Sequence, residues 1–150
     1  MNRRDFLTTA AGAASFTALQ SYAFAAANEQ PLRVALIGCG WYGKTDLFHL
    51  MQVAPVKVVG LCDVDSQAAA NAAELVAQRQ ASKTKPPLYG DFRKLLAEHR
   101  PEIVLIGTPD HWHALPMIEA CRAGGDVYVQ KPISLDVVEG QAMVAAARKY

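Results

Sequence analysis

The sequence has almost no net charge, since its 150 residues include 15 lysines and arginines against 14 aspartates and glutamates. Proteins that hold nucleic acid or an anionic membrane do so largely through an excess of positive side chains. This chain lacks that excess. We therefore expect neither nucleic acid nor a membrane as a partner, apart from passage across a membrane during export.

Cysteine is also scarce. The three cysteines, Cys39, Cys62 and Cys121, are widely spaced and form no C-x-x-C pair. That spacing argues against a disulfide framework and a structural zinc site, and it predicts buried free thiols. His111 and His113 form an H-x-H pair, but two ligands do not make a metal site, and no other close ligand is visible in the sequence. We predict no bound metal.

Long runs of large aliphatic residues are absent as well. Residues 8–27 are weakly apolar, but they are rich in alanine, threonine and serine, and Gln20 interrupts them. Such a segment would insert poorly into a bilayer as a membrane anchor. It follows the pair Arg3-Arg4 and contains the small-x-small sequence Ala23-Phe24-Ala25 near its end. A basic start, an apolar stretch and a cleavage site in this order resemble a bacterial twin-arginine signal peptide.

We therefore predict a signal peptide over residues 1–27 and export of the mature protein to the periplasm or elsewhere outside the cytoplasm. The remaining sequence, residues 31–150, has a length that suits one folded domain.

The sequence does contain a glycine-rich turn in an informative context. A strand-length apolar run, Arg33 to Ile37, leads directly into a G-x-G-x-x-G pattern. In a dinucleotide-binding fold, the first glycine allows a sharp turn, the second lets the backbone approach a pyrophosphate, and the third lets the following helix pack tightly on the sheet. These roles fall to Gly38, Gly40 and Gly43. We expect the amides of Trp41 and Tyr42 to point at the phosphates from the helix N-terminus.

An acidic residue follows at the distance that a dinucleotide site requires. The apolar run 56–62 predicts a second strand with Asp63 at its C-terminal tip. A carboxylate there can accept hydrogen bonds from both adenosine ribose hydroxyls and would repel a 2′-phosphate. The alternative is that Asp63 only caps the next helix, but Asp65 is better placed for that and would leave Asp63 free for the ribose. We therefore expect NAD rather than NADP as the cofactor.

The rest of the sequence alternates between helix and strand patterns. We predict helices over about residues 42–53 and 65–80, a helix capped by Asp91, one with Pro116 in its first turn and Gly124-Gly125 at its end, and a last one that Ser134 caps and that reaches Tyr150. Strands over residues 88–89, 103–107 and 127–129 separate them. This alternation predicts an α/β fold, a Rossmann-type doubly wound parallel sheet with right-handed crossovers.

Two later segments make the sequence recognisable. Thr108-Pro109-Asp110-His111-Trp112-His113 has the pattern T-P-x-x-x-H, and Gln130-Lys131-Pro132 has the pattern x-K-P. Together with the glycine motif and the strand-end aspartate, these segments resemble the N-terminal domain of the glucose–fructose oxidoreductase, inositol dehydrogenase and MocA family. The resemblance covers residues 31–150. It implies an NAD(P)-binding domain that precedes a substrate domain, in enzymes that oxidise or reduce sugars and polyols.

The resemblance also implies roles for individual residues. Thr108 and Pro109 would line the cofactor near its nicotinamide half, at the C-terminal end of a central strand. Asp110 stands where the family commonly has Asn, and His113 matches a recurrent family histidine on the cofactor side.

Lys131 matches the family's catalytic-site lysine, whose ammonium would hydrogen-bond the reacting hydroxyl and stabilise developing alkoxide charge. Gln130, also on the cofactor side, replaces the usual Glu and removes a negative charge beside Lys131.

The acid/base residues of the family belong to the substrate domain, and we expect this chain to be truncated before that domain and before a sixth strand. The full-length protein would act on a sugar or polyol and form a homo-oligomer. Two alternatives stay open: a non-catalytic module that binds nucleotide or packs on a partner, and a fragment of a redox-neutral, NAD-dependent epimerase or glycosidase.

Overall fold

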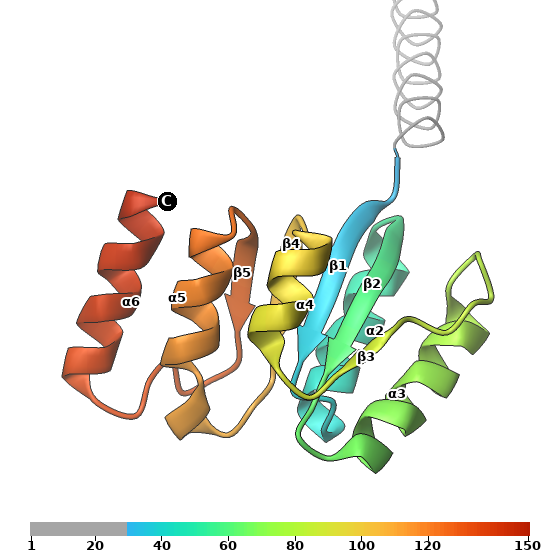
Figure 1. The fold of residues 1–150 in the computed structure, drawn as a ribbon, viewed down its shortest axis with the longest axis horizontal. Coiled ribbons are helices and arrows are strands. Elements are labelled where there is room, and N and C mark those ends of the chain that lie inside the picture. Colours follow the sequence, from blue (N-terminus) through green and yellow to red (C-terminus); the bar gives the residue numbers. More distant parts are fainter. Residues whose placement is uncertain (1–29) are drawn as a thin grey trace, which may run out of the picture. The chain divides into compact units, whose positions relative to one another are not determined.

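The computed structural model describes residues 30–150, and the signal peptide predicted over residues 1–27 lies outside them. Five parallel strands form one sheet in the order β3-β2-β1-β4-β5 (Figure 1). The strands are β1 (Leu32–Ile37), β2 (Val56–Cys62), β3 (Leu88–Tyr89), β4 (Ile103–Ile106) and β5 (Asp126–Val129). This order reverses direction at β1, which is the doubly wound topology that the sequence predicts.

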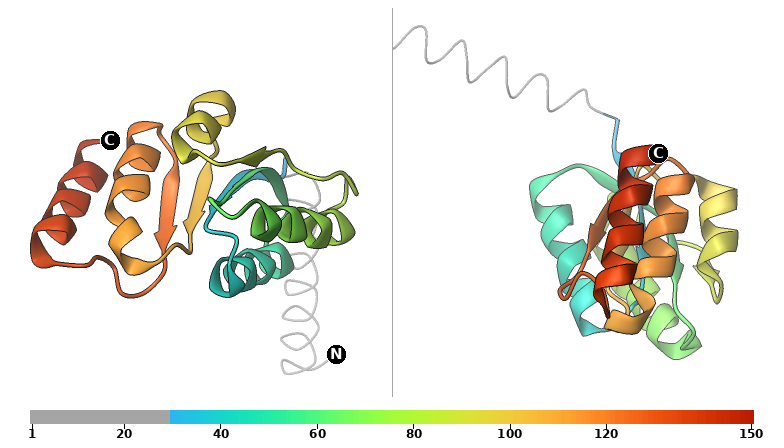
Figure 2. Two further views of the ribbon diagram at one scale, coloured as in Figure 1. Left: turned by 60° about the horizontal axis from the view of Figure 1, so that its bottom comes forward. Right: turned by 90° about the vertical axis from the view of Figure 1, so that its left-hand side faces the viewer.

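Helices cover both faces of this sheet (Figure 2). They are α2 (Trp41–Val53), α3 (Ser66–Arg79), α4 (Phe92–His99), the short 3₁₀ helix η1 (Asp110–Trp112), α5 (Ala114–Arg122) and α6 (Val137–Lys149). One cluster of buried side chains packs α2 and α3 on one face of the sheet, and a second cluster packs α4 and α5 on the other face. In Figure 1, α6 lies beside α5, beyond the β5 edge of the sheet.

The central strand β1 shows why the sequence carries continuous apolar runs. Val34 and Leu36 join the core cluster on the α2 and α3 side, whereas Ala35 and Ile37 join the cluster on the α4 side. Successive side chains of a strand point to opposite faces, and here both faces are covered. All four residues are therefore buried.

Two of the predicted helix caps are confirmed and one is wrong. The Asp65 side chain accepts hydrogen bonds from the amides of Gln67 and Ala68 at the start of α3, and Asp91 caps α4 in the same way. Ser134 does not cap α6. Helix α6 begins at Val137, so the amides that need a partner lie too far from Ser134, and Asp136 caps the helix instead.

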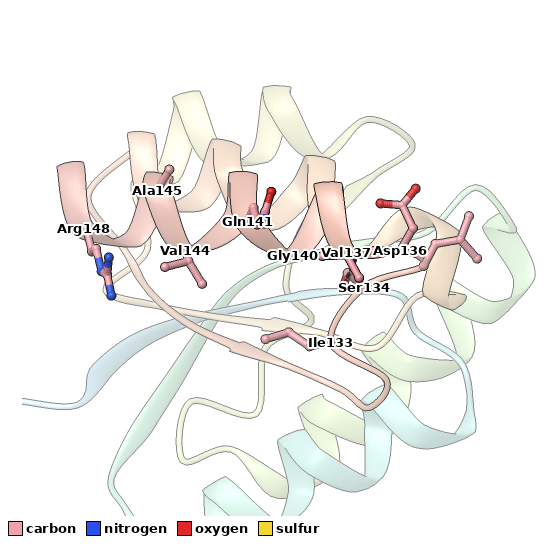
Figure 3. A pocket seen from close by; sticks show the side chains of 10 residues that line it. Ile133, Ser134, Asp136, Val137, Gly140, Gln141, Val144, Ala145 and Arg148 are labelled. Carbon is pink, nitrogen blue, oxygen red and sulfur yellow. Dashed lines mark hydrogen bonds between the residues drawn. The ribbon is translucent and has the colours of Figure 1, made fainter.

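An open apolar groove runs along α6 (Figure 3). Its lining includes Ile133 from the preceding loop together with Val137, Val144 and Arg148 from the helix. Ile133 and Val137 are 61% and 75% exposed. Side chains of this kind usually pack against something, so this face of α6 has an unpartnered apolar surface within residues 30–150. In the same part of the chain, the structure has no helix with the length and hydrophobicity of a membrane span.

The tightest packing in the fold predicts a specific sensitivity to added volume. A Cβ atom at Gly43 would lie 2.0 Å from the carbonyl oxygen of Gly38. We expect Gly43→Ala to lower the free energy of unfolding by about 3 kcal/mol and the melting temperature by roughly 10 °C. Gly90→Ala is the matched control, because a Cβ at Gly90 meets nothing within 4 Å. Equal melting temperatures for the two variants, measured by circular dichroism, would show that this contact does not constrain the fold.

Candidate functional site

The predicted site residues follow the carboxyl ends of four strands. The glycine motif follows β1, Asp63 follows β2, Thr108 follows β4 and Lys131 follows β5. Because all the strands are parallel, these ends lie at one edge of the sheet. Ligands of open α/β sheets bind at this edge, where the strand order reverses. The fold therefore brings together segments that are far apart in the sequence.

The glycine motif behaves as predicted at Gly38 and Gly43. Gly38 has a φ of +91°, which L side chains rarely adopt, and a Cβ there would lie 2.6 Å from the carbonyl carbon of Gly107. Gly43 sits against the Gly38 carbonyl, so α2 packs backbone to backbone on the turn. Both glycines are required by the fold itself.

Gly40 differs from the other two glycines of the motif. It is the N-cap residue of α2, and a Cβ built on it meets nothing within 4 Å. The fold does not require glycine there, but the close approach of a phosphate would explain it. No side chain caps α2 within the described residues. The first amides of the helix, including those of Trp41 and Tyr42, therefore suit an anionic ligand.

Asp63 has more contacts than the sequence predicts. Its Oδ2 atom accepts a hydrogen bond from the Cys39 amide at 2.7 Å, and its Oδ1 atom accepts one from the Asp65 amide at 2.9 Å. Asp65 is the helix cap, as expected, and Asp63 is not, but the two oxygens of Asp63 already accept hydrogen bonds from backbone amides. Each carboxylate oxygen can accept two hydrogen bonds, so acceptor capacity for two ribose hydroxyls remains. Asp63 therefore fixes the glycine turn and keeps acceptor capacity at the sheet edge where we expect the ribose.

The cysteines beside Asp63 are packing residues. All three cysteines are buried and free, as predicted. Burial, together with the nearby Asp63 carboxylate, raises the pKa of both the Cys39 and the Cys62 thiol to about 12. Both stay protonated at neutral pH, which makes them poor nucleophiles and poor metal ligands.

The loop after β4 is held by its own hydrogen bonds. The Thr108 hydroxyl donates to the Trp112 carbonyl at 3.1 Å, and Pro109 precedes η1. The Asp110 side chain lies at the surface and accepts a hydrogen bond from the His111 amide. Thr108 and Pro109 thus lie at the strand end, as the predicted role near the cofactor requires.

His113 holds two loops together and does not itself face a ligand. It is 1% exposed. Its Nε2 atom lies 2.8 Å from the Thr108 carbonyl oxygen, and its Nδ1 atom lies 2.6 Å from that of Pro132. Because the ring is buried and both nitrogens lie next to backbone carbonyl oxygens, the side chain is closed to direct contact with a cofactor, contrary to the expectation that it binds one. It positions the loop after β4 against the loop after β5.

Lys131 lies against helix α2. Its Nζ atom is 4.9 Å from the centroid of the Tyr42 ring, and the rings of Trp41 and Tyr42 meet edge to face at 4.5 Å. The preceding residue, Gln130, accepts a hydrogen bond from the Lys131 amide at 2.7 Å and donates one to Asp46 Oδ2 at 2.8 Å. The candidate catalytic lysine is thus tied to the helix that carries the glycine motif.

Asp46 is a residue of this site that the sequence analysis missed. It lies on α2, three residues after Gly43, and no motif marks it. The sequence holds one indication of this contact. Gln130 stands where the family usually has Glu, and a neutral amide suits a position that faces a carboxylate such as Asp46.

No metal site is found among residues 30–150, where no three His, Cys, Asp or Glu side chains lie close enough to hold an ion. The H-x-H pair is divided between two environments, since His113 is buried while His111 is exposed beside Asp110.

Comparison with known proteins agrees with this geometry. The model of an oxidoreductase family named for glucose–fructose oxidoreductase, inositol dehydrogenase and MocA, described as an NAD-binding Rossmann fold, matches residues 32–150. The chain belongs to this family. It is therefore an NAD-binding domain of an oxidoreductase family, as the sequence predicts.

Two relatives and a solved structure show what this family domain resembles. A glycosyl hydrolase family 109 protein of Stenotrophomonas maltophilia is 34% identical over 131 residues, which cover 83% of this chain and 28% of that protein. A D-apiose dehydrogenase of Paraburkholderia graminis is 32% identical, over 77% of this chain and 29% of that protein. The structure of the WlbA dehydrogenase from Bordetella pertussis, in complex with NADH and UDP-GlcNAcA, has a TM-score of 0.68 at 25% identity and covers 80% of this chain and 35% of that one. The chain thus spans about a third of the length of such proteins.

The double role of Asp63 predicts the behaviour of its variants. Asp63→Ala removes both the ribose acceptor and the bond to the Cys39 amide, so we expect NAD to bind at least about tenfold more weakly. NADP should be less affected, because the repulsion of its 2′-phosphate is also lost. Isothermal titration calorimetry measures both affinities. Asp126→Ala, at the opposite end of the sheet, is the control, and an equal loss of NAD affinity in that variant would contradict the assignment.

The Gln130–Asp46 contact predicts a charge conflict that a second substitution relieves. Gln130→Glu places two carboxylates in contact, and we expect the free energy of unfolding to fall by about 2 kcal/mol. In an Asp46→Asn background the new Glu regains a donor, so the same substitution should cost less than about 0.5 kcal/mol. Urea denaturation of the four proteins measures both costs. Equal costs in the two backgrounds would show that these side chains do not interact.

Proposed function

We propose that this domain belongs to a longer, exported oxidoreductase that transfers a hydride to or from a hydroxyl-bearing carbon of a sugar or polyol. The observation that carries the proposal is Lys131, an exposed ammonium placed beside the glycine motif of an NAD-binding domain. Two further findings support the substrate class. One relative is named for D-apiose, and one similar structure holds NADH together with UDP-GlcNAcA.

The residues of this chain divide the work between holding the cofactor and polarising the substrate. The amides at the start of α2 bind the pyrophosphate, and Asp63 binds the adenosine ribose. NAD, when bound, accepts the hydride from the carbinol carbon or returns it. The ammonium of Lys131 hydrogen-bonds the substrate oxygen and stabilises the negative charge that develops as its proton leaves. The group that takes the proton belongs to another part of the full-length protein.

A redox-neutral reaction is the second candidate, because one relative is named a glycosyl hydrolase. Such an enzyme would oxidise its substrate and re-reduce it in the same active site, so that NAD is regenerated in each cycle. The predicted signal peptide also favours this candidate. Twin-arginine export carries folded proteins, so the cofactor would be loaded before export. Free NAD is not expected to be replenished outside the inner membrane.

One experiment separates these possibilities. The full-length protein is purified from the periplasm, and the supernatant after denaturation is assayed for nicotinamide nucleotide. We expect about one nucleotide per protein if the cofactor is retained. The protein is then incubated with polyols, free sugars and nitrophenyl glycosides. Accumulation of NADH indicates a dehydrogenase, whereas release of nitrophenol without net NADH indicates the redox-neutral reaction.

The role of Lys131 is tested in the same assay. Lys131→Met should lower kcat by about 100-fold or more, because it removes the hydrogen bond to the reacting oxygen. Its NAD affinity should stay close to that of the wild type. Full turnover in this variant would refute the catalytic role of Lys131. If the wild-type protein binds NAD but converts no substrate, the non-catalytic module is the better description.

A further inference from the structure

One face of helix α2 contacts the segment that carries Lys131 at two points. Tyr42 and Asp46 are four residues apart, so they lie on the same side of the helix. The Tyr42 ring lies under the Lys131 ammonium, and the Asp46 carboxylate accepts a hydrogen bond from Gln130. The two contacts hold the side chain of Lys131 and the backbone that precedes it.

The hydrogen bonds of Gln130 have a fixed direction. A carboxylate can only accept, so Asp46 selects the NH₂ group of the Gln130 amide. The carbonyl oxygen of that amide then points the other way, and it accepts the hydrogen bond from the Lys131 amide at 2.7 Å. The backbone of Gln130 is itself fixed, because its amide donates to the Ile106 carbonyl at 2.9 Å. Asp46 thus orients the peptide unit from which the lysine side chain extends.

The ring of Tyr42 acts on the other end of the lysine. An ammonium within about 6 Å of a ring centroid is attracted to the negative face of the ring. The Lys131 contact is 4.9 Å. A lysine side chain has several rotatable bonds, and this attraction favours the conformers that keep Nζ near the start of α2.

We propose that Tyr42 and Asp46 are positioning residues for Lys131, and that α2 thereby sets the place of the ammonium relative to the phosphate-binding turn at its own N-terminus. This inference rests on the proposed function for the role of Lys131 in the reaction. The positioning itself is a property of the domain, and it can be measured without substrate.

The direct test uses nuclear magnetic resonance of the domain after reductive ¹³C-methylation of its lysines. Methyl groups on Nζ of Lys131 lie over the Tyr42 ring, so we expect an upfield-shifted signal that disappears in Lys131→Arg. Tyr42→Leu should return this signal to the position of a free lysine. Asp46→Leu should move it part of the way, and Asp46→Asn, which keeps an acceptor for Gln130, should restore the wild-type shift.

The chain contains its own matched control. At the end of α6, Lys149 Nζ lies 5.0 Å from the centroid of the ring of Tyr150, the residue that follows the helix. Tyr150→Leu should move the Lys149 signal and leave that of Lys131 in place. An unchanged Lys149 signal in the Tyr42 and Asp46 variants shows that their effect is local to Lys131, and an unchanged circular dichroism melting curve shows that the variants are folded. A Lys131 signal that is unshifted in the wild type, or that neither Tyr42→Leu nor Asp46→Leu moves, would overturn the proposal.

A kinetic readout in the full-length enzyme distinguishes this inference from the proposed function. Asp46→Leu should lower kcat by about tenfold with little change in KM, since misplacement of a catalytic group slows the chemical step. Asp46→Asn should recover most of that loss. If Lys131→Met keeps full activity, the proposed function fails while the resonance result still stands. If Lys131→Met is inactive and Asp46→Leu is fully active, the positioning role fails alone.

Discussion

The site depends on one close contact, the backbone-to-backbone packing of α2 on the turn that follows β1. Gly43 lies against the Gly38 carbonyl. Gly107, which follows β4, lies against Gly43, and a Cβ on Gly107 would come within 2.6 Å of the Gly43 Cα. Only hydrogen atoms fit between these segments. The N-terminus of α2 is therefore fixed at the sheet edge, and every later contact of that helix follows from this position.

Carboxylates then tie the neighbouring strand ends to the same turn and helix. Asp63 bonds the Cys39 amide inside the glycine turn, and Asp46 bonds Gln130 at the end of β5. Neither carboxylate has a lysine or arginine partner in these bonds. Both accept from neutral N–H groups, which hold them in place without neutralising their charge. These bonds thus leave in place the Asp63 charge that we expect to disfavour a 2′-phosphate.

The sequence predicts those features of the site that depend on local backbone geometry. The turn at Gly38, the cap at Asp65 and the strand end at Asp63 each follow from a short run of neighbouring residues, and each is found. The contact of His113 with Pro132 spans 19 residues and that of Gln130 with Asp46 spans 84, and no periodicity marks them. The cap at Ser134 fails for a related reason. Which polar residue caps a helix depends on where the loop before it is anchored, and here the cap lies two residues later than the sequence suggests, at Asp136.

The proposed reaction also needs a group that accepts a proton, and the described residues around Lys131 do not supply an evident one. The oxidation of an alcohol needs an acceptor for the hydroxyl proton as well as an acceptor for the hydride. Lys131 can stabilise an oxyanion, but as an ammonium it cannot take the proton. Asp46 accepts a hydrogen bond from Gln130 at its Oδ2 atom, which assigns it to holding the segment before Lys131. His113 is buried, and its two ring nitrogens lie 2.6 and 2.8 Å from backbone carbonyl oxygens, so neither is open to a substrate. In the proposed reaction, the base would therefore come from the substrate domain that the family resemblance implies, and it would reach Lys131 from the solvent-exposed side of the lysine.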